Sequence, residues 1–282
     1  MPEIKQLVPI TKVLQKGRTN RMKHFRANIP ICIEKNNFIV KTADSPEELR
    51  EALKLRHDVF LLELLKRKKR SGIDKDKFDK YCDHLIIIDK RINKIIGTYR
   101  LQSSEHTKKW YTATEFHMRY IKKLPGVKLE LGRACVHPEH RNGITISLLW
   151  EGINAYIAAT GSSYLFGCSS IKTMDKDEIR QIYAYLMQNG FISECHRVRP
   201  KSKFKVPGFN RFSRLHPLHS HIPIEHQIMR EKIPSLLASY LRVGAKVCGV
   251  PALDKSFKCI DFLTLMKVDD MNKAYNRKQK AE

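Results

Sequence analysis

The chain has 282 residues, which is enough for one large domain with a buried core. Its 53 basic and 29 acidic residues give a formal net charge of +24, which predicts an acidic partner: nucleic acid, an anionic membrane surface or an acidic carrier protein. No window approaches the roughly 18 consecutive apolar residues of a membrane-spanning helix, and the N-terminus lacks the apolar stretch of a secretory leader. We therefore expect neither a membrane span nor a leader.

The first residues, 1–36, show no periodicity and predict a basic arm, whereas residues 37–282 predict a single domain. A strand is expected at 38–43. The run Ser45-Pro46-Glu47-Glu48 is a capping box with proline at the first helical position, and an apolar stripe continues from it to Leu64. These features predict a strand followed by a long amphipathic helix.

In the middle of the chain, the sequence predicts further strands and helices. Residues 84–89 and 95–102 predict a hairpin, and 127–136 another strand. A helix over 144–159, a buried strand at 164–168 and a helix from Asp175 to near Gly190 follow. Antiparallel strands before a β-α-β crossover predict an α/β fold with a mixed sheet.

The C-terminal extension, 191–282, begins with a proline-containing loop that has no acidic residue between Cys195 and Ile224. A helix at 234–243 and a strand at 262–268 are too few elements for a second core, so we expect the extension to complete the same domain. The seven cysteines are odd in number and never form a C-x-x-C pair, which is typical of a reducing cytoplasm without a disulfide framework.

Glu130 and Arg133 are the main candidates for chemistry. Three residues apart in a regular strand, they would point to opposite faces, but Gly132 between them predicts a β-bulge that brings both to one side. A carboxylate there could accept a proton from an amine, beside backbone N–H groups able to hold an oxyanion. An ordinary ion pair at a strand end fits the spacing equally well.

A resemblance to a known family covers roughly residues 38 to 268. It is carried by LRHDVF, FDKYCDHL, GTYRL, ELGRACVHPEHRN, LLW, YLFGC and YLRVGAKVCGVPALDKSF, in this order. Together these blocks resemble the GCN5-related N-acyltransferases, and within them the bacterial ornithine N-acyltransferases, which share a branch with acyl-homoserine-lactone and N-acyl amino acid synthases. The resemblance implies a fold with splayed central strands. It also implies transfer of a 3-hydroxyacyl chain from acyl carrier protein to the ornithine α-amine, giving lyso-ornithine lipid.

The resemblance implies roles for individual residues. Glu130 would be the base, and Arg133 with Arg100 would bind the acceptor carboxylate. Further candidates are Asp79 and Asp83 for the cationic end of ornithine, Glu115 for the substrate amine, and two residues lining the acyl entrance, Arg56 and Phe60. For each, an ion pair, a cap or plain core packing is the alternative. No metal and no cofactor beyond the donor thioester are expected.

The donor would meet the turn after the 127–136 strand. The residues expected to contact pantetheine are Val136, Arg141, Asn142 and Gly143. Coenzyme A users of this fold carry glycines at the turn, but here Ile144 and Ile146 take their places, which favours carrier-bound phosphopantetheine. Tyr183 could protonate the leaving thiolate, or could belong to the core.

Two alternative functions remain open at this stage. The same chemistry could use glycine, lysine or another amino acid, or the chain could be a non-catalytic nucleic-acid-binding protein. Because the basic runs lack interleaved aromatic residues, we do not expect nucleic acid as the partner. We expect the runs at 66–70 and 195–224 to dock acyl carrier protein or anionic lipid, which would place the enzyme at the inner membrane face.

Overall fold

The computed structural model describes residues 24–218 and 220–271. In this part of the chain nine strands form one sheet in the order β1-β2-β3-β4-β5-β6-β9-β7, with β8 paired to β9. Only β5 and β6 run parallel, so the mixed sheet predicted from the sequence is confirmed. The strands are β1 Cys32–Lys35, β2 Phe38–Thr42, β3 Asp83–Asp89, β4 Lys94–Ser103, β5 Val127–Val136, β6 Ser162–Ile171, β7 Lys246–Val247, β8 Ala252–Asp254 and β9 Cys259–Lys267.

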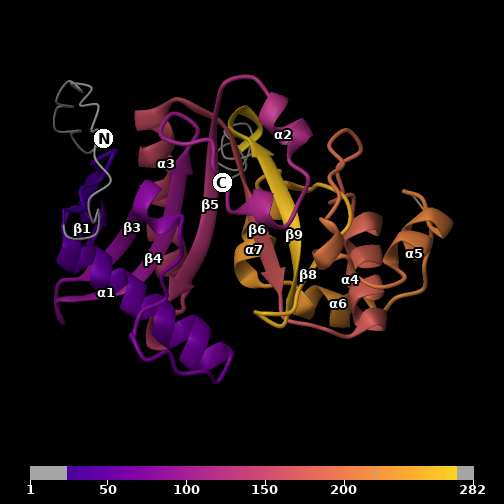
Figure 1. Ribbon diagram of the computed structural model, residues 1–282, viewed down its shortest axis with the longest axis horizontal. Coiled ribbons are helices and arrows are strands. Elements are labelled where there is room, and N and C mark those ends of the chain that lie inside the picture. The colour runs from indigo at the N-terminus through magenta and orange to yellow at the C-terminus, as the bar shows by residue number, and fades with distance from the viewer. Residues whose placement is uncertain (1–23, 219, 272–282) are drawn as a thin grey trace.

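Helices cover both faces of the sheet (Figure 1). Leu49 and Leu53 of α1 pack in one cluster with Ile86, whereas α3 packs in another with Leu85 and Ile87. Neighbouring residues of a strand face opposite ways, so α1 and α3 lie on opposite faces. The helices are α1 Pro46–Arg56, α2 Arg119–Lys123, α3 Gly143–Thr160, α4 Lys176–Gln188, α5 Phe209–Leu215, α6 His226–Lys232 and α7 Ser235–Arg242.

Local sequence signals set where several helices begin. The Ser45 hydroxyl accepts a hydrogen bond from the Glu48 amide (3.1 Å), and Asp175 caps α4 through the Glu178 amide (2.7 Å). The first helix differs from the prediction beyond Arg56, where His57–Leu64 continues as a π-helical segment.

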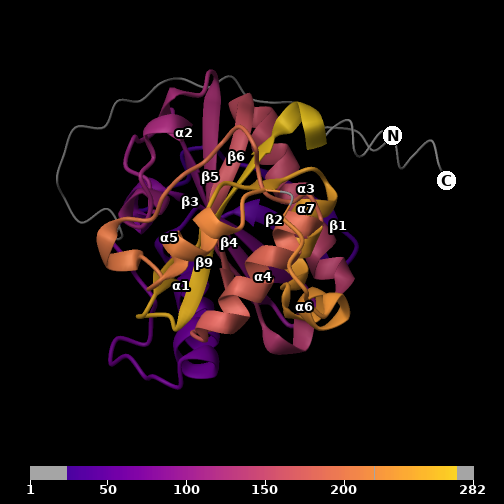
Figure 2. The same cartoon turned by 90° about the vertical axis from the view of Figure 1, so that its right-hand side faces the viewer.

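The ends of the chain contribute more to the sheet than the sequence pattern indicated. β1 lies inside the segment 1–36 that was expected to be a basic arm, so its last residues belong to the sheet; residues 1–23 lie outside the described part. In the extension, β9 pairs with β6 along most of its length, from Ile260 opposite Ile171 to Lys267 opposite Tyr164. In Figure 2, α4, α6 and α7 are seen on the same side of the sheet as α3.

The parallel strands β5 and β6 separate partway along their length. They pair from Val127 to Glu130, opposite Ser162 to Phe166, and the remainder of β5 leaves β6. Just beyond the last pair, at Gly167, a Cβ atom would lie 2.1 Å from the Leu131 carbonyl oxygen. Glycine at this position lets the strands pass before they splay.

Candidate active site

Glu130 lies at the last paired position of β5, directly before the strands separate. Its side chain is buried, and the residue is only 4% exposed. The two carboxylate oxygens accept hydrogen bonds from the backbone amides of Tyr111 (2.8 Å) and Thr112 (2.7 Å). Burial raises the pKa of Glu130, although these hydrogen bonds and the Arg100 charge favour the ionised form. Glu130 is therefore a buried, firmly oriented carboxylate.

A β-bulge places Arg133 on the same side of the sheet as Glu130. Thr98 pairs with Cys135 and Arg100 with Gly132, so Tyr99 alone faces two residues of β5. Arg133 adopts φ = 54°, and its guanidinium lies 4.5 Å from the centre of the Tyr111 ring, whose own amide binds Glu130. The bulge predicted from Gly132 is confirmed. Arg133 Nε has no hydrogen-bond partner among the described residues.

Arg56, Asp79 and Arg100 form a buried ionic network beside this pair. Asp79 Oδ1 lies 2.7 Å from Arg56 Nη1 and 3.0 Å from Arg100 Nη1, and Arg100 also binds Asp76 at 2.7 Å. Burial opposes the charge of Asp79, but the two arginines outweigh it and hold the pKa of Asp79 well below its usual range. Asp79 therefore orients Arg100. Arg56 has no exposed surface, so it does not line an acyl entrance as the sequence predicted.

Three other sequence candidates lie away from Glu130. Asp83 faces α3, where it accepts hydrogen bonds from the Tyr156 hydroxyl (2.8 Å) and the Asn28 amide (2.7 Å). Tyr183 packs edge-on against Phe209 in the hydrophobic cluster under α4, with a 5.2 Å centroid separation. Phe60 contacts Phe257, whose ring lies 5.1 Å from the Arg133 guanidinium, so Phe60 lies at the outer edge of the site.

Glu115 belongs to a buried cluster of three carboxylates. Oxygen atoms of Glu115, Asp254 and Asp261 lie within 4.8 Å of one another, close enough to hold one cation, either an ammonium group or a metal ion. Burial raises the pKa of Glu115 to about 9, and the charge of Asp261 adds to this. Asp254 and Asp261 were not predicted from the sequence, because they reach the site through the pairing of β8 with β9 and of β9 with β6.

The residues expected to hold pantetheine surround the start of α3. The Asn142 side chain caps the helix by accepting from the Thr145 amide (3.0 Å), and Gly143 is exposed at its first turn. Arg141 forms two hydrogen bonds with Glu63 (2.6 and 2.5 Å) and donates a third to the Val136 carbonyl (3.2 Å). Hydrogen bonds made by the side chains of Asn142 and Arg141 therefore stabilise the conformation of the turn.

A narrow cavity of about 30 Å³ opens where β5 and β6 separate. Its polar groups include the hydroxyls of Tyr99 and Tyr240, which bind each other. The other lining residues are largely apolar and include Leu131, Leu165 and Met266. A space this small holds about one water molecule. A long acyl chain therefore enters here only if the walls move apart.

Comparison with known proteins agrees with this architecture. Residues 55–151 match the acetyltransferase (GNAT) domain family. A curated L-ornithine N(alpha)-acyltransferase of Rhizobium meliloti (strain 1021) is 30% identical over 256 residues, covering 85% of this chain and 83% of that protein. The enzyme of the same name from Brucella abortus (strain 2308) is 29% identical, covering 84% and 86%.

A solved structure, that of the CoA-dependent acyl-homoserine lactone synthase BjaI, is 13% identical to this chain. It has a TM-score of 0.46, with 82% of each chain covered.

The sheet order, the splayed strands and the matched domain define an acyltransferase with the GCN5-related fold. The coverage and identity of the curated relatives go further: the chain belongs to the L-ornithine N(alpha)-acyltransferase family. Within the described residues, no helix combines the length and apolar character that a membrane crossing requires.

Proposed function

We propose that the enzyme acylates the α-amine of ornithine with a chain delivered as a thioester on acyl carrier protein. The observation that carries the proposal is the position of Glu130. It lies buried at the point where β5 and β6 separate, with Arg133 brought beside it by the bulge. The names of the curated relatives support ornithine as the acceptor.

Glu130 acts as the base in this proposal. The acceptor ammonium must lose a proton before its nitrogen attacks the thioester carbon, after which the C–S bond breaks and the carrier thiol leaves with a proton. A carboxylate offers about four acceptor positions, and the Tyr111 and Thr112 amides occupy two of them. Burial raises the pKa of Glu130, which makes it a better proton acceptor than an exposed glutamate.

The acceptor fits between groups of opposite charge. Arg133, whose Nε makes no hydrogen bond among the described residues and lies 3.6 Å from Asp74 Oδ2, would bind the α-carboxylate. The cluster of Glu115, Asp254 and Asp261 would take the ammonium at the far end of ornithine, because it is buried and needs a cation to ionise fully. Glycine has no such group, and the charge distribution therefore favours a basic amino acid.

The donor would enter from the side where β5 and β6 separate. Ile144, at the first turn of α3, is 62% exposed, and it stands where coenzyme A users of the fold carry glycine. This side chain keeps the backbone from wrapping a diphosphate, which supports a carrier-bound phosphopantetheine. The acyl chain would then part β6 and α7 near Tyr240, and the product would be a lyso-ornithine lipid.

A direct assay tests this function. The purified chain is given 3-hydroxyacyl-loaded acyl carrier protein or the matching coenzyme A thioester, with ornithine, lysine or glycine, and products are identified by mass spectrometry. We expect acylornithine from the carrier-bound donor as the fastest reaction. Equal rates with glycine would overturn the role of the carboxylate cluster, and faster reaction with coenzyme A would overturn the carrier as donor.

A further inference from the structure

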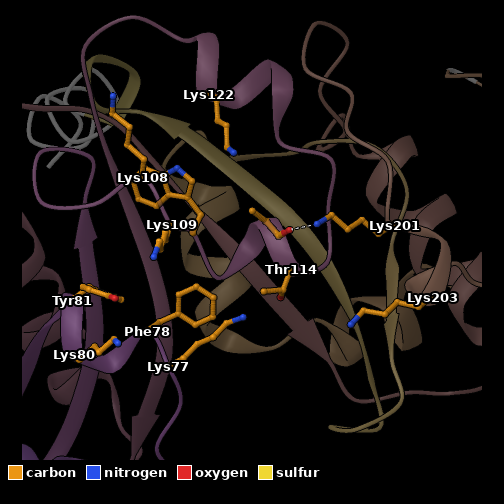
Figure 3. A pocket seen from close by; sticks show the side chains of 12 residues that line it. Lys77, Phe78, Lys80, Tyr81, Lys108, Lys109, Thr114, Lys122, Lys201 and Lys203 are labelled. Carbon is orange, nitrogen blue, oxygen red and sulfur yellow. Dashed lines mark hydrogen bonds between the residues drawn. The ribbon is translucent and has the colours of Figure 1, made fainter. Parts of the chain in front are cut away.

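A second, much larger cavity lies at the opposite end of β5 from the start of α3. Its volume is about 780 Å³, within the range of sites for ligands of drug size. Four segments form its walls: residues 77–81 before β3, residues 108–114 between β4 and β5, Lys122 of α2, and the loop containing Lys201 and Lys203. Figure 3 shows lysines from all four segments around one open space.

The lining of this lysine cavity is cationic and contains no carboxylate. Seven of its residues are lysines: Lys77, Lys80, Lys108, Lys109, Lys122, Lys201 and Lys203. All of these except Lys80 lack an ion pair with any carboxylate in the described part of the chain. Lys201 donates to the Ala113 carbonyl (2.5 Å), which fixes the basic loop against the wall. Like charges gathered in a concave wall repel one another, and an anion relieves that repulsion.

The floor of the lysine cavity is aromatic. Phe78 and Trp110 are buried at 6% and 5% exposure, and Tyr81 lies at the rim. Tyr120, in the same short helix α2 as Lys122, is 47% exposed. Basic side chains beside aromatic rings, here the buried Phe78 and Trp110 in the floor and the exposed Tyr120 nearby, are typical of proteins that rest on the headgroup layer of a membrane.

The lysine cavity is separate from both substrates of the proposed reaction. The segment 110–114 lies between it and Glu130, because Glu130 binds the Tyr111 and Thr112 amides while Trp110, Ala113 and Thr114 line the cavity. A cationic amino acid would be repelled by its wall. The start of α3, where the donor phosphate is expected, follows the far end of β5, which is six residues beyond Glu130, or roughly 20 Å along the strand.

We propose that the lysine cavity binds the phosphate-bearing headgroup of an anionic phospholipid and thereby holds the enzyme on a membrane surface. The lysine ammoniums pair with the headgroup phosphate, and the aromatic floor meets the less polar glycerol part of the lipid. This site goes beyond acyl transfer, since no residue of the reaction centre lines it.

The test is binding of the full chain to vesicles, measured by flotation. Vesicles contain phosphatidylcholine alone or phosphatidylcholine with phosphatidylglycerol. The cavity variant carries Lys77→Glu, Lys109→Glu and Lys203→Glu. A matched control carries Lys172→Glu, Lys176→Glu and Lys255→Glu, three exposed lysines outside the cavity that give the same change in net charge. Circular dichroism and thermal melting confirm that both variants fold.

We expect wild type and control to bind the anionic vesicles and the cavity variant to bind about tenfold or more weakly, because each lysine near an anionic surface contributes to the affinity. Lys→Arg at the same three cavity positions should restore binding. If charge reversal unfolds the chain, Lys→Gln at these positions makes the same comparison.

Three results would overturn the proposal. The first is an equal loss of vesicle binding in the cavity variant and the control, which would indicate general charge attraction. The second is binding of soluble glycerol phosphate as tight as that of vesicles, which would indicate a small-molecule site. The third is a cavity variant that binds vesicles normally but loses affinity for acyl carrier protein, which would make the carrier the occupant.

Discussion

Two buried carboxylates, Asp79 and Glu115, have pKa values shifted in opposite directions although each is only 1% exposed. Asp79 lies between two arginines, which hold its pKa well below the usual range. Glu115 has Asp261 and Asp254 as neighbours, and burial together with these charges raises its pKa to about 9. Burial raises the pKa of both carboxylates, so the sign of the neighbouring charges accounts for the difference between the two pKa values.

This difference in pKa distinguishes two regions of the site with different roles. The region around Asp79 is already neutralised by protein groups and is suited to fixing Arg100 in place. Among the described residues, no lysine or arginine forms a salt bridge with Glu115, Asp254 or Asp261, so this region is suited to receive a cation from a substrate. Glu130 lies between them, oriented by backbone amides.

Removing the charge of Asp79 should produce the largest effect on stability. Asp79→Asn leaves two buried arginines without their shared partner, and we expect a loss of about 3–5 kcal/mol in the free energy of unfolding. Denaturant unfolding measures this loss. The control is Asp177→Asn, which removes an exposed partner of Arg180 and should change the free energy of unfolding by no more than about 0.5 kcal/mol. Because its folded pKa is lowered, the contribution of Asp79 is present above about pH 4 and lost on acidification. Equal stability of the two variants would contradict the network.

Glu115→Gln should weaken ornithine binding with little change in turnover. Loss of one hydrogen bond to a charged group predicts a rise in the KM for ornithine of about ten- to a hundredfold, with kcat nearly unchanged. Steady-state kinetics measure it, and Glu105→Gln, at an exposed position, serves as the matched control. A large fall in kcat at constant KM would instead place Glu115 in the chemical step.

The pH dependence of ornithine binding should depend on Glu115. Since the pKa of Glu115 is raised to about 9, its carboxyl group is protonated below that pH and must lose its proton when an ammonium group binds. The KM for ornithine should fall by up to about tenfold per pH unit as the pH rises towards 9, and should change less in Glu115→Gln. Identical profiles for the two proteins would show that Glu115 does not meet the substrate. Addition of Mg²⁺ as a competitor tests whether a metal ion takes the same place.

The smallest effect concerns the close contact between β5 and β6 at Gly167. Gly167→Ala would place a Cβ atom 2.1 Å from a backbone oxygen, and we expect a loss of about 1–3 kcal/mol as the strands move apart. Gly143→Ala is the control, because a Cβ atom there meets nothing within 4 Å. Thermal unfolding compares the two, and equal melting temperatures would show that the strands adjust without cost.

Local sequence signals predicted much of the fold. The capping residues Ser45 and Asp175 were recognised from spacing, as was the bulge beside Gly132, because each depends on neighbours within a few positions. The strand at 127–136 has the observed bounds. β1, α5 and α6 were missed because short elements carry too little periodicity, and they are stabilised by tertiary packing.

The site was predicted less completely than the fold. Glu130 and Arg133 lie near each other in the chain, so a local rule sufficed for them. The network of Arg56 and Asp79, and the cluster that includes Asp254 and Asp261, join residues distant in sequence. Their pairing depends on strand order and on which face each side chain takes, and neither can be read from spacing alone.

Single-turnover acyl transfer by wild type and Glu130→Gln tests the central claim most directly. The enzyme is mixed in excess with acyl carrier protein bearing one labelled 3-hydroxyacyl chain, at saturating ornithine, and the labelled amide is followed in time. We predict that Glu130→Gln, with unchanged melting temperature, forms the amide about 10²- to 10⁴-fold more slowly than wild type. An equal rate in the folded variant would contradict Glu130 as the base.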